Sequence, residues 1–310
     1  TAELMDVLLY AVRGEAIVNR ALRDKGAAEE KASRQIIDAL FSTITNANFD
    51  DEALKMRIDK ALSMKNELIG KKRSIGLPSL PEVAFHPAPD RYESAAERVG
   101  VLSMENEDIR SLKQMVVYGV KGAAAYTEHA LNLGFADPDI FAMIENALAE
   151  VCRPDIDADA LTALVLNVGE CGVKAMALLD KANTTTYGNP EITKVNIGVG
   201  KNPGILVSGH DLKDFEELLE QTAGTGVDVY THSEMLPAHY YPAFKKYPHF
   251  VGNYGNAWWR QREEFATFNG PILFTTNCIV PPRPNAAYAD RIYTTGSSGL
   301  PGATHIPDRK

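Results

Sequence analysis

The hydrophobic pattern of this chain changes its period once, between residues 183 and 190. Before that point apolar residues recur at three- and four-residue steps, as they do from Leu4 to Leu22, which is the repeat of a buried helix face. After it, short apolar runs alternate with short helical segments, which is typical of a parallel sheet with helices on its faces. We therefore predict an α + α/β chain. An N-terminal helical bundle domain covers 1–188, and a Rossmann-like parallel-sheet α/β domain, which the chain need not contain in full, covers 189–310.

Local signals predict the individual elements. Four prolines between 76 and 90 indicate a loop, and Asp137 before Pro138 indicates a helix start. Asp211 is predicted to cap the helix that follows the first strand. The predicted helices cover 4–22, 29–41, 52–68, 93–98, 107–133, 138–152, 158–183, 211–222, 242–247 and a short segment around 263–264, and the predicted strands cover 204–208, 227–230, 249–251 and 271–276.

Composition excludes several classes of protein. Of the 310 residues 45% are hydrophobic and 24% are charged, so the chain is not disordered. The formal net charge of −9 and the lack of a Lys/Arg-rich run argue against binding to nucleic acid or to an anionic membrane. We find no apolar stretch near the ~18 residues of a membrane span and no signal peptide. The three cysteines form no disulfide framework, which favours a reducing cytoplasm.

Three candidate metal ligands follow three of the predicted strands. His210 follows the first strand, Glu234 the second, and Cys278 the strand at 271–276. Since the carboxyl ends of parallel strands share one edge, we expect these side chains to converge there. A mixed set of nitrogen, oxygen and sulfur donors suits a transition metal. Each residue taken alone is more often an ordinary loop or core residue, and only the recurrence at successive strand ends favours a metal site.

Long segments of the chain resemble one family. LVSGHDLKD at 206–214, GTGVDVYTHSEMLPAH at 224–239 and LFTTNCI at 273–279 resemble the hybrid cluster protein family, also called prismane protein or hydroxylamine reductase. Further matches lie at 43–50, 119–130, 182–193 and 251–255, so the resemblance extends over essentially the whole chain.

The resemblance implies two iron–sulfur centres in the complete protein. One is a 4Fe–4S cubane held by four N-terminal cysteines, and the other is a hybrid iron–sulfur–oxygen cluster. His210, Glu234 and Cys278 match hybrid-cluster ligands, while a second Glu and three more cysteines come from a C-terminal domain. Asn277 is expected to hydrogen-bond to a cluster atom, and Thr45 and Asn46 are weaker candidates for facing it.

This chain departs from the family pattern in its cysteines. None precedes Cys152 and none follows Cys278, so neither the cubane motif nor the other hybrid-cluster cysteines are present. We therefore expect a fragment whose partner is the missing C-terminal half, and whose bound cluster, if any, is incomplete. Cys152 and Cys171 match no ligand position and are predicted to pack between helices.

The resemblance also implies a function for the full-length protein. That function is reduction of hydroxylamine to ammonia, of nitric oxide to nitrous oxide, or both, with a redox electron donor, and Glu234 and His210 are its expected catalytic residues. A carbon monoxide dehydrogenase-like enzyme is one alternative, against which the carboxylate at Glu234 argues. A clusterless structural fragment, inactive when isolated, is the other.

Overall fold

A computed structural model describes residues 1–71 and 76–307. Its chain divides into two compact units. The helical unit comprises residues 1–44, 50–131 and 135–179, and the sheet unit comprises 45–49, 132–134 and 180–310. The family resemblance and the change of period predicted this α + α/β composition, and the structure confirms it.

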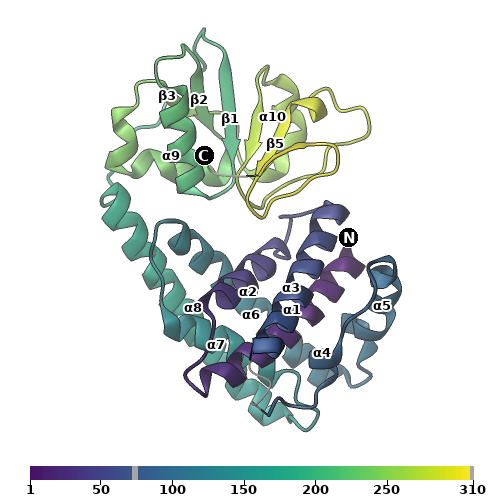
Figure 1. Cartoon of the computed structure of the whole chain (residues 1–310). Coiled ribbons are helices and arrows are strands. Elements are labelled where there is room, and N and C mark those ends of the chain that lie inside the picture. Colours follow the sequence, from purple (N-terminus) through teal and green to yellow (C-terminus); the bar gives the residue numbers. More distant parts are fainter. Residues whose placement is uncertain (72–75, 308–310) are drawn as a thin grey trace. The chain divides into compact units, whose positions relative to one another are not determined.

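The helical unit forms because each long helix has one apolar stripe. Leu4, Val7, Leu8 and Val12 of the first helix are buried, and they share a core with residues of its neighbours. Figure 1 shows these helices in the purple to teal part of the chain. They are α1 (Ala2–Arg23), α2 (Glu30–Ser42), α3 (Asp51–Lys71), α4 (Pro81–Ala84), α5 (Tyr92–Val99), α6 (Glu107–Asn132), α7 (Pro138–Glu150) and α8 (Ala158–Tyr187).

Two single-turn helices lie where the sequence predicted only a loop. They are α4 and the 3₁₀ turn η1 (Pro89–Arg91), and each begins at a proline, Pro81 and Pro89. Proline is tolerated at the first helical position because the missing N–H has no partner there in any case. The predicted cap at Asp137 is confirmed, since its side chain accepts a hydrogen bond from the Asp139 backbone N–H.

Helix α8 corrects one sequence expectation. By length and composition it is apolar enough to cross a membrane, with an 18-residue window of mean hydropathy 1.4, of which 28% is buried. The expectation that no stretch comes near this length is therefore wrong by this criterion. Within the helical unit, α8 buries a narrow stripe against the core at Leu161, Leu164, Val168, Cys171 and Ala175. Cys171 is thus a helix-packing residue, as predicted.

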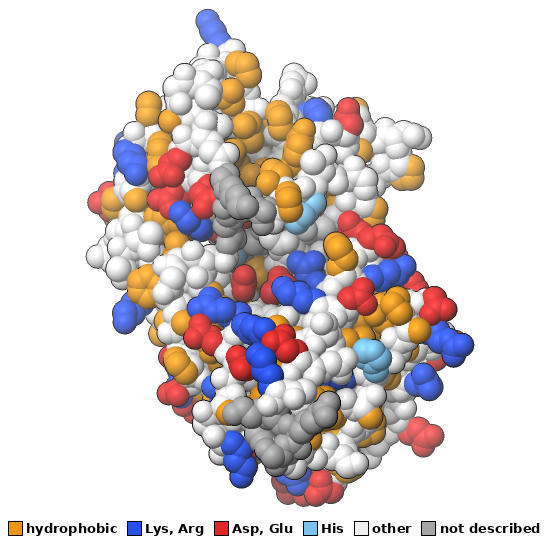
Figure 2. All heavy atoms as spheres, viewed as in Figure 1, with side chains coloured by type: hydrophobic (Ala, Val, Ile, Leu, Met, Phe, Trp, Pro, Cys, Tyr) orange, Lys and Arg blue, Asp and Glu red, His pale blue; other side chains and the backbone are white. Residues whose placement is uncertain are grey.

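On the face shown in Figure 2, acidic and basic side chains of the described residues are interspersed.

Inside the helical unit, two carboxylates are buried, one with several hydrogen-bond donors and one with an unsatisfied oxygen. Glu145, 1% exposed, accepts hydrogen bonds from Asn19, Ser33 and Arg23. Glu15 is fully buried, and among the described residues its Oε1 has no hydrogen-bond partner. Burial, and next the negative charge of Glu145, hold the pKa of Glu15 well above its usual range.

Glu15→Gln is therefore expected to stabilise the chain at neutral and higher pH. The pKa of Glu15 is higher in the folded state than in the unfolded state, where it is near 4.5. Glu15 therefore contributes its full stability to the fold below pH 4.5, and this contribution is lost as the pH rises toward the pKa of the folded state. An unsatisfied buried polar group costs roughly 1–3 kcal/mol, so we expect a gain of about 1 kcal/mol at pH 8 and little at pH 4.5. Urea unfolding at the two pH values measures this. The control Glu97→Gln, at an exposed position, should leave the free energy of unfolding unchanged at both pH values. An equal gain in stability for Glu15→Gln at pH 4.5 and pH 8 would contradict this account.

The sheet unit contains six parallel strands in the order β3-β2-β1-β4-β5-β6. This is the doubly wound order, in which the connections leave β1 in opposite directions. Figure 1 shows α9 in front of these strands. The strands are β1 (Gly204–Ser208), β2 (Asp228–Thr231), β3 (Phe250–Asn253), β4 (Ile272–Phe274), β5 (Ile292–Thr295) and β6 (Thr304–Ile306). The helices are α9 (Leu212–Thr222), η3 (Ser233–Tyr240), η4 (Pro242–Lys246), η5 (Trp258–Arg260), α10 (Gln261–Thr267) and η6 (Ala289–Arg291).

Alternate strand residues pack on opposite faces of the sheet. Leu206 packs with Phe265 of α10, whereas Val207 packs with Phe215 of α9. Asp211 caps α9 as predicted, accepting hydrogen bonds from the backbone N–H groups of Lys213 and Asp214. Strands β5 and β6 were not predicted. Of these β6 is exposed throughout, so it lacks the apolar run by which the inner strands are predicted.

Candidate functional site

The three predicted ligands lie beyond the carboxyl ends of neighbouring strands. His210 is two residues past β1, Glu234 three past β2 and Cys278 four past β4. Because the sheet order is β2-β1-β4, these three ends adjoin one another, and β1 and β4 flank the point where the strand order reverses. Ligands of doubly wound sheets bind at that point.

Each of the three residues lies at or directly after a left-handed backbone turn. Gly209 has a φ of 113°, Ser233 of 53° and Cys278 itself of 71°. Only four non-glycine residues among those described have positive φ, and Ser233, Cys278 and the adjoining Asn46 are three of them. Such conformations cost of order 1–3 kcal/mol and collect at functional sites.

Glycine is required before His210 because the ends of β1 and β4 nearly touch. A β-carbon at Gly209 would lie 2.5 Å from the Thr275 hydroxyl oxygen and 2.7 Å from the Thr276 backbone nitrogen. Thr276 also fixes the imidazole, with 2.9 Å between its Oγ1 and Nδ1 of half-buried His210. A metal-bound histidine commonly has one ring nitrogen held by such a hydrogen bond. Thr276 therefore restricts the orientation of the His210 ring.

Cys278 is held in its strained conformation by a buried amide. The side chain of Gln261, 0% exposed, donates from Nε2 to the Cys278 carbonyl oxygen at 2.5 Å and accepts from the Val280 backbone N–H at 3.0 Å. The Ile279 N–H donates to the Asn46 carbonyl oxygen at 3.0 Å. Burial raises the pKa of the half-buried Cys278 thiol to about 11, and the negative charge of Glu234 acts in the same direction.

Glu234 differs from the other two because its side chain is exposed, in the first turn of η3. Beneath that turn, fully buried His232 lies 2.8 Å from Glu264 through Nε2, and the Ser208 hydroxyl lies 3.5 Å from its Nδ1. Ser208 is also fully buried, so this group does not form a hydrolytic triad open to substrate. It fixes the backbone that leads into Glu234.

The donor set fits part of an iron–sulfur–oxygen centre. It offers imidazole nitrogen, carboxylate oxygen and thiolate sulfur at one edge, and the Ser233 hydroxyl beside Glu234 is buried with no hydrogen-bond partner among the described residues. Within 1–71 and 76–307 no three His, Cys, Asp or Glu side chains are grouped closely enough to hold a metal ion. The side chains of His210, Glu234 and Cys278 therefore do not converge into a metal-holding group as expected, and their role as ligands stays a prediction.

The remaining predicted residues lie around the same edge. Asn277 is half-buried between Thr276 and Cys278, and Thr45 is exposed. Asn46 contributes its backbone carbonyl to the turn at Cys278. Gln261 and Thr276 were not predicted as residues of this site. Two threonines directly after a buried strand could have indicated Thr276, whereas no local pattern indicates Gln261.

Comparison with known proteins agrees with the resemblance drawn from the motifs. The whole chain, residues 1–310, matches the Prismane/CO dehydrogenase family. The chain belongs to that family. It is similar to proteins named hydroxylamine reductase: 61% identical to one from Bacteroides fragilis, 60% to one from Bacteroides thetaiotaomicron and 55% to one from Clostridium botulinum. Each alignment covers 100% of this chain.

The chain spans only 56–59% of the length of these relatives. Membership of the Prismane/CO dehydrogenase family implies an iron–sulfur cluster. The positions of His210, Glu234 and Cys278 as its ligands remain predictions, consistent with a site at the strand ends.

The strained turn makes a prediction that contrasts two cysteines. At Cys278 the left-handed backbone conformation is unfavourable for any residue with a β-carbon. The Cys278→Gly variant should therefore be more stable than Cys278→Ala, with a free energy of unfolding about 1 kcal/mol higher. At Cys171, within α8, the order should reverse by about 1 kcal/mol because glycine weakens a helix interior. Urea unfolding of the four variants tests this. The same order at both sites would mean that the Cys278 turn is not strained.

Proposed function

We propose that the protein carrying this chain reduces hydroxylamine to ammonia at an iron–sulfur–oxygen cluster, with His210, Glu234 and Cys278 among the ligands. One observation carries the proposal: a nitrogen, an oxygen and a sulfur donor each lie at or directly after a left-handed turn at three adjoining strand ends. The names of the relatives support the choice of substrate. The reaction adds two electrons and two protons to hydroxylamine and releases ammonia and water.

The chain's own residues hold and position the reacting centre. Thr276 orients the imidazole of His210, and the Gln261 amide hydrogen-bonds to both the Cys278 carbonyl and the Val280 N–H. Glu234 is exposed on a short 3₁₀ turn, so it has room to shift as substrate binds. Asn277, next to Cys278, would hydrogen-bond to a cluster atom. When bound, the cluster supplies iron with an open coordination position and the electrons for breaking the N–O bond.

The proposal includes partners outside the described site. The remaining ligands, and the cysteines of a 4Fe–4S centre, would come from the part of the relatives' length that this chain does not span, and a separate redox protein would supply electrons. Three free cysteines fit a reducing compartment, which we propose is the cytoplasm.

Three other possibilities remain as alternatives to be tested. The family description includes carbon monoxide dehydrogenases, and an all-thiolate and histidine ligand set would fit them better than one containing Glu234. Nitric oxide reduction to nitrous oxide would use the same centre. A chain that holds no cluster would have a structural role only.

Substitution of the ligands in the full-length protein tests the proposal. Cys278→Ala and Glu234→Ala are expected to lower hydroxylamine-dependent oxidation of a reduced viologen by at least about 100-fold, because loss of even a residue that hydrogen-bonds to a metal ligand typically costs about 10–100-fold. Iron and acid-labile sulfide per chain should fall as well. Cys171→Ala, a buried cysteine of the helical unit, is the matched control and should keep both activity and iron.

Full activity and iron content in both ligand variants would refute the assignment of the site. The variants could instead keep their iron, lose hydroxylamine reduction and oxidise carbon monoxide. That result would favour a carbon monoxide dehydrogenase.

A further inference from the structure

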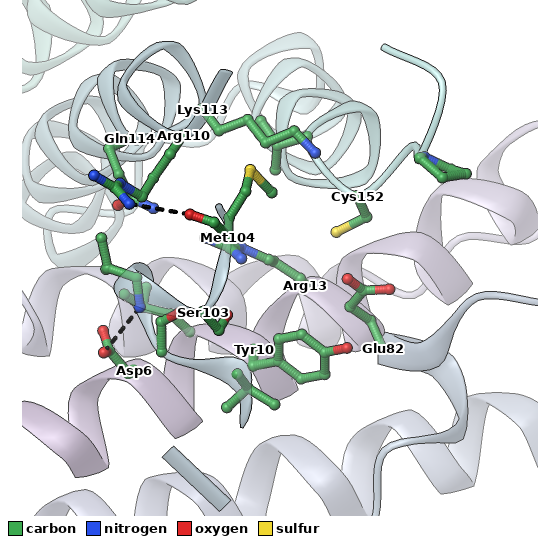
Figure 3. A pocket seen from close by; sticks show the side chains of 16 residues that line it. Asp6, Tyr10, Arg13, Glu82, Ser103, Met104, Arg110, Lys113, Gln114 and Cys152 are labelled. Atoms are coloured by element: carbon green, nitrogen blue, oxygen red, sulfur yellow. Dashed lines mark hydrogen bonds between the residues drawn. The ribbon is translucent and has the colours of Figure 1, made fainter. Parts of the chain in front are cut away.

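A cavity of about 240 Å³ lies entirely within the helical unit, and neither the proposed function nor the comparisons assign it a role. Residues of α1, α4 and α6 and the turn after α7 line it (Figure 3). The volume is below the roughly 300–1,000 Å³ of pockets that take drug-sized ligands, so any occupant is small. Its walls carry an unusual number of charges: Asp6, Arg13, Glu82, Arg110 and Lys113.

Four of these charges, those of Asp6, Arg13, Glu82 and Lys113, lack an ion-pair partner among the described residues, whereas Arg110 lies 3.7 Å from Glu107. Glu82 is 8% exposed, and its Oε2 is buried and accepts no hydrogen bond there. Nε of Arg13 is buried and likewise has no acceptor. Lys113, 9% exposed, reaches only the Arg153 carbonyl oxygen at 3.4 Å. Buried charges are costly unless they are paired, so these groups favour a ligand that pairs with them.

Asp6 and Arg110 are hydrogen-bonded to neutral backbone groups, and two further polar groups of the wall are uncharged. Asp6 accepts a hydrogen bond from the Val101 backbone N–H, and Arg110 donates to the Met104 carbonyl oxygen. Burial raises the pKa of the Cys152 thiol and of the Tyr10 phenol, each to about 12, so both are neutral at physiological pH. Cys152 was predicted only to pack between helices, and the structure shows that it also lines this cavity.

The available charges specify the ligand. Arg13, Arg110 and Lys113 bring three positive charges and Asp6 and Glu82 bring two negative charges, so the walls carry one net positive charge, and Glu82 has an unused acceptor. A ligand with one negative charge balances this set, and a hydroxyl on the ligand satisfies Glu82. Figure 3 shows Glu82, Cys152 and Lys113 along one side of the cavity, with Arg13 reaching in from α1.

We propose that this cavity binds a small singly charged oxyanion that also carries a hydroxyl, as hydrogencarbonate or a small hydroxycarboxylate does. Its oxygens accept hydrogen bonds from Arg13 and Lys113, and its hydroxyl donates to Glu82. The site is in the helical unit, so its test does not depend on the proposed cluster chemistry.

Isothermal titration calorimetry on the 310-residue chain tests the proposal with matched probes. Glycolate and acetate have the same charge and differ in the hydroxyl, and hydrogencarbonate and nitrate form a second such pair. We expect glycolate and hydrogencarbonate to bind at least tenfold more tightly than acetate and nitrate, because a hydrogen bond to a charged group is worth about 1.5–3 kcal/mol, and a tenfold change in affinity is 1.4 kcal/mol.

Substitutions then assign the role of each residue. Arg13→Leu should weaken all four probes at least tenfold, and Glu82→Leu should abolish the preference for the hydroxylated probe of each pair. Arg34→Leu, which removes an exposed arginine on α2, is the control and should change nothing. Circular dichroism checks that each variant folds, and Lys113→Met replaces Arg13→Leu if that variant does not.

Saturable binding with the expected preference, lost in the variants, supports the proposal. No saturable binding of any probe would overturn it, and would mean that water alone pairs Arg13 with Glu82. Binding that ignores the hydroxyl, or that survives both Arg13→Leu and Lys113→Met, would overturn it equally.

Discussion

The carboxyl ends of β1 and β4 approach so closely that residue 209 has no room for a side chain, and the candidate site depends on this contact. It lies where the chain, having formed β1, continues to β2 and β3 on one side and to β4 on the other. The approach brings the Thr276 hydroxyl to the ring of His210, although the two residues are 66 positions apart in sequence. It also determines which strand ends can contribute ligands to one centre.

A second constraint is the backbone strain at these strand ends. Ser233 and Cys278 occupy conformations that residues with a β-carbon rarely adopt, and they persist only where the surroundings hold them. Around Cys278 that support comes from the Gln261 amide and the Asn46 carbonyl. Both supports come from the chain's own residues.

The sequence predicted those parts of the molecule that leave a local signal. Long helices such as α1 and α8 and the inner strands β1, β2 and β4 follow from periodicity, and the position of each candidate ligand follows from the strand before it. Strands β5 and β6 could not be predicted, because β6 is exposed and the link between them, 296–303, holds no helix. Parallel strands usually need a longer crossover than this.

Contacts that join distant residues were equally beyond prediction. Gln261 acts on a turn 17 residues away, and nothing in its own helix indicates the pairing. The charged cavity of the helical unit draws Arg13, Glu82 and Lys113 from three separate helices, α1, α4 and α6, and no local pattern in the sequence indicates that they meet.

The central claim is that His210, Glu234 and Cys278 hold iron at the shared edge of β2, β1 and β4. Anomalous scattering at the iron absorption edge, recorded from anaerobic crystals of the full-length protein, tests it most directly. The account predicts anomalous peaks within bonding distance of all three side chains, about 2.0–2.3 Å. Peaks confined to other parts of the protein, with these three side chains bound to no metal, would contradict it.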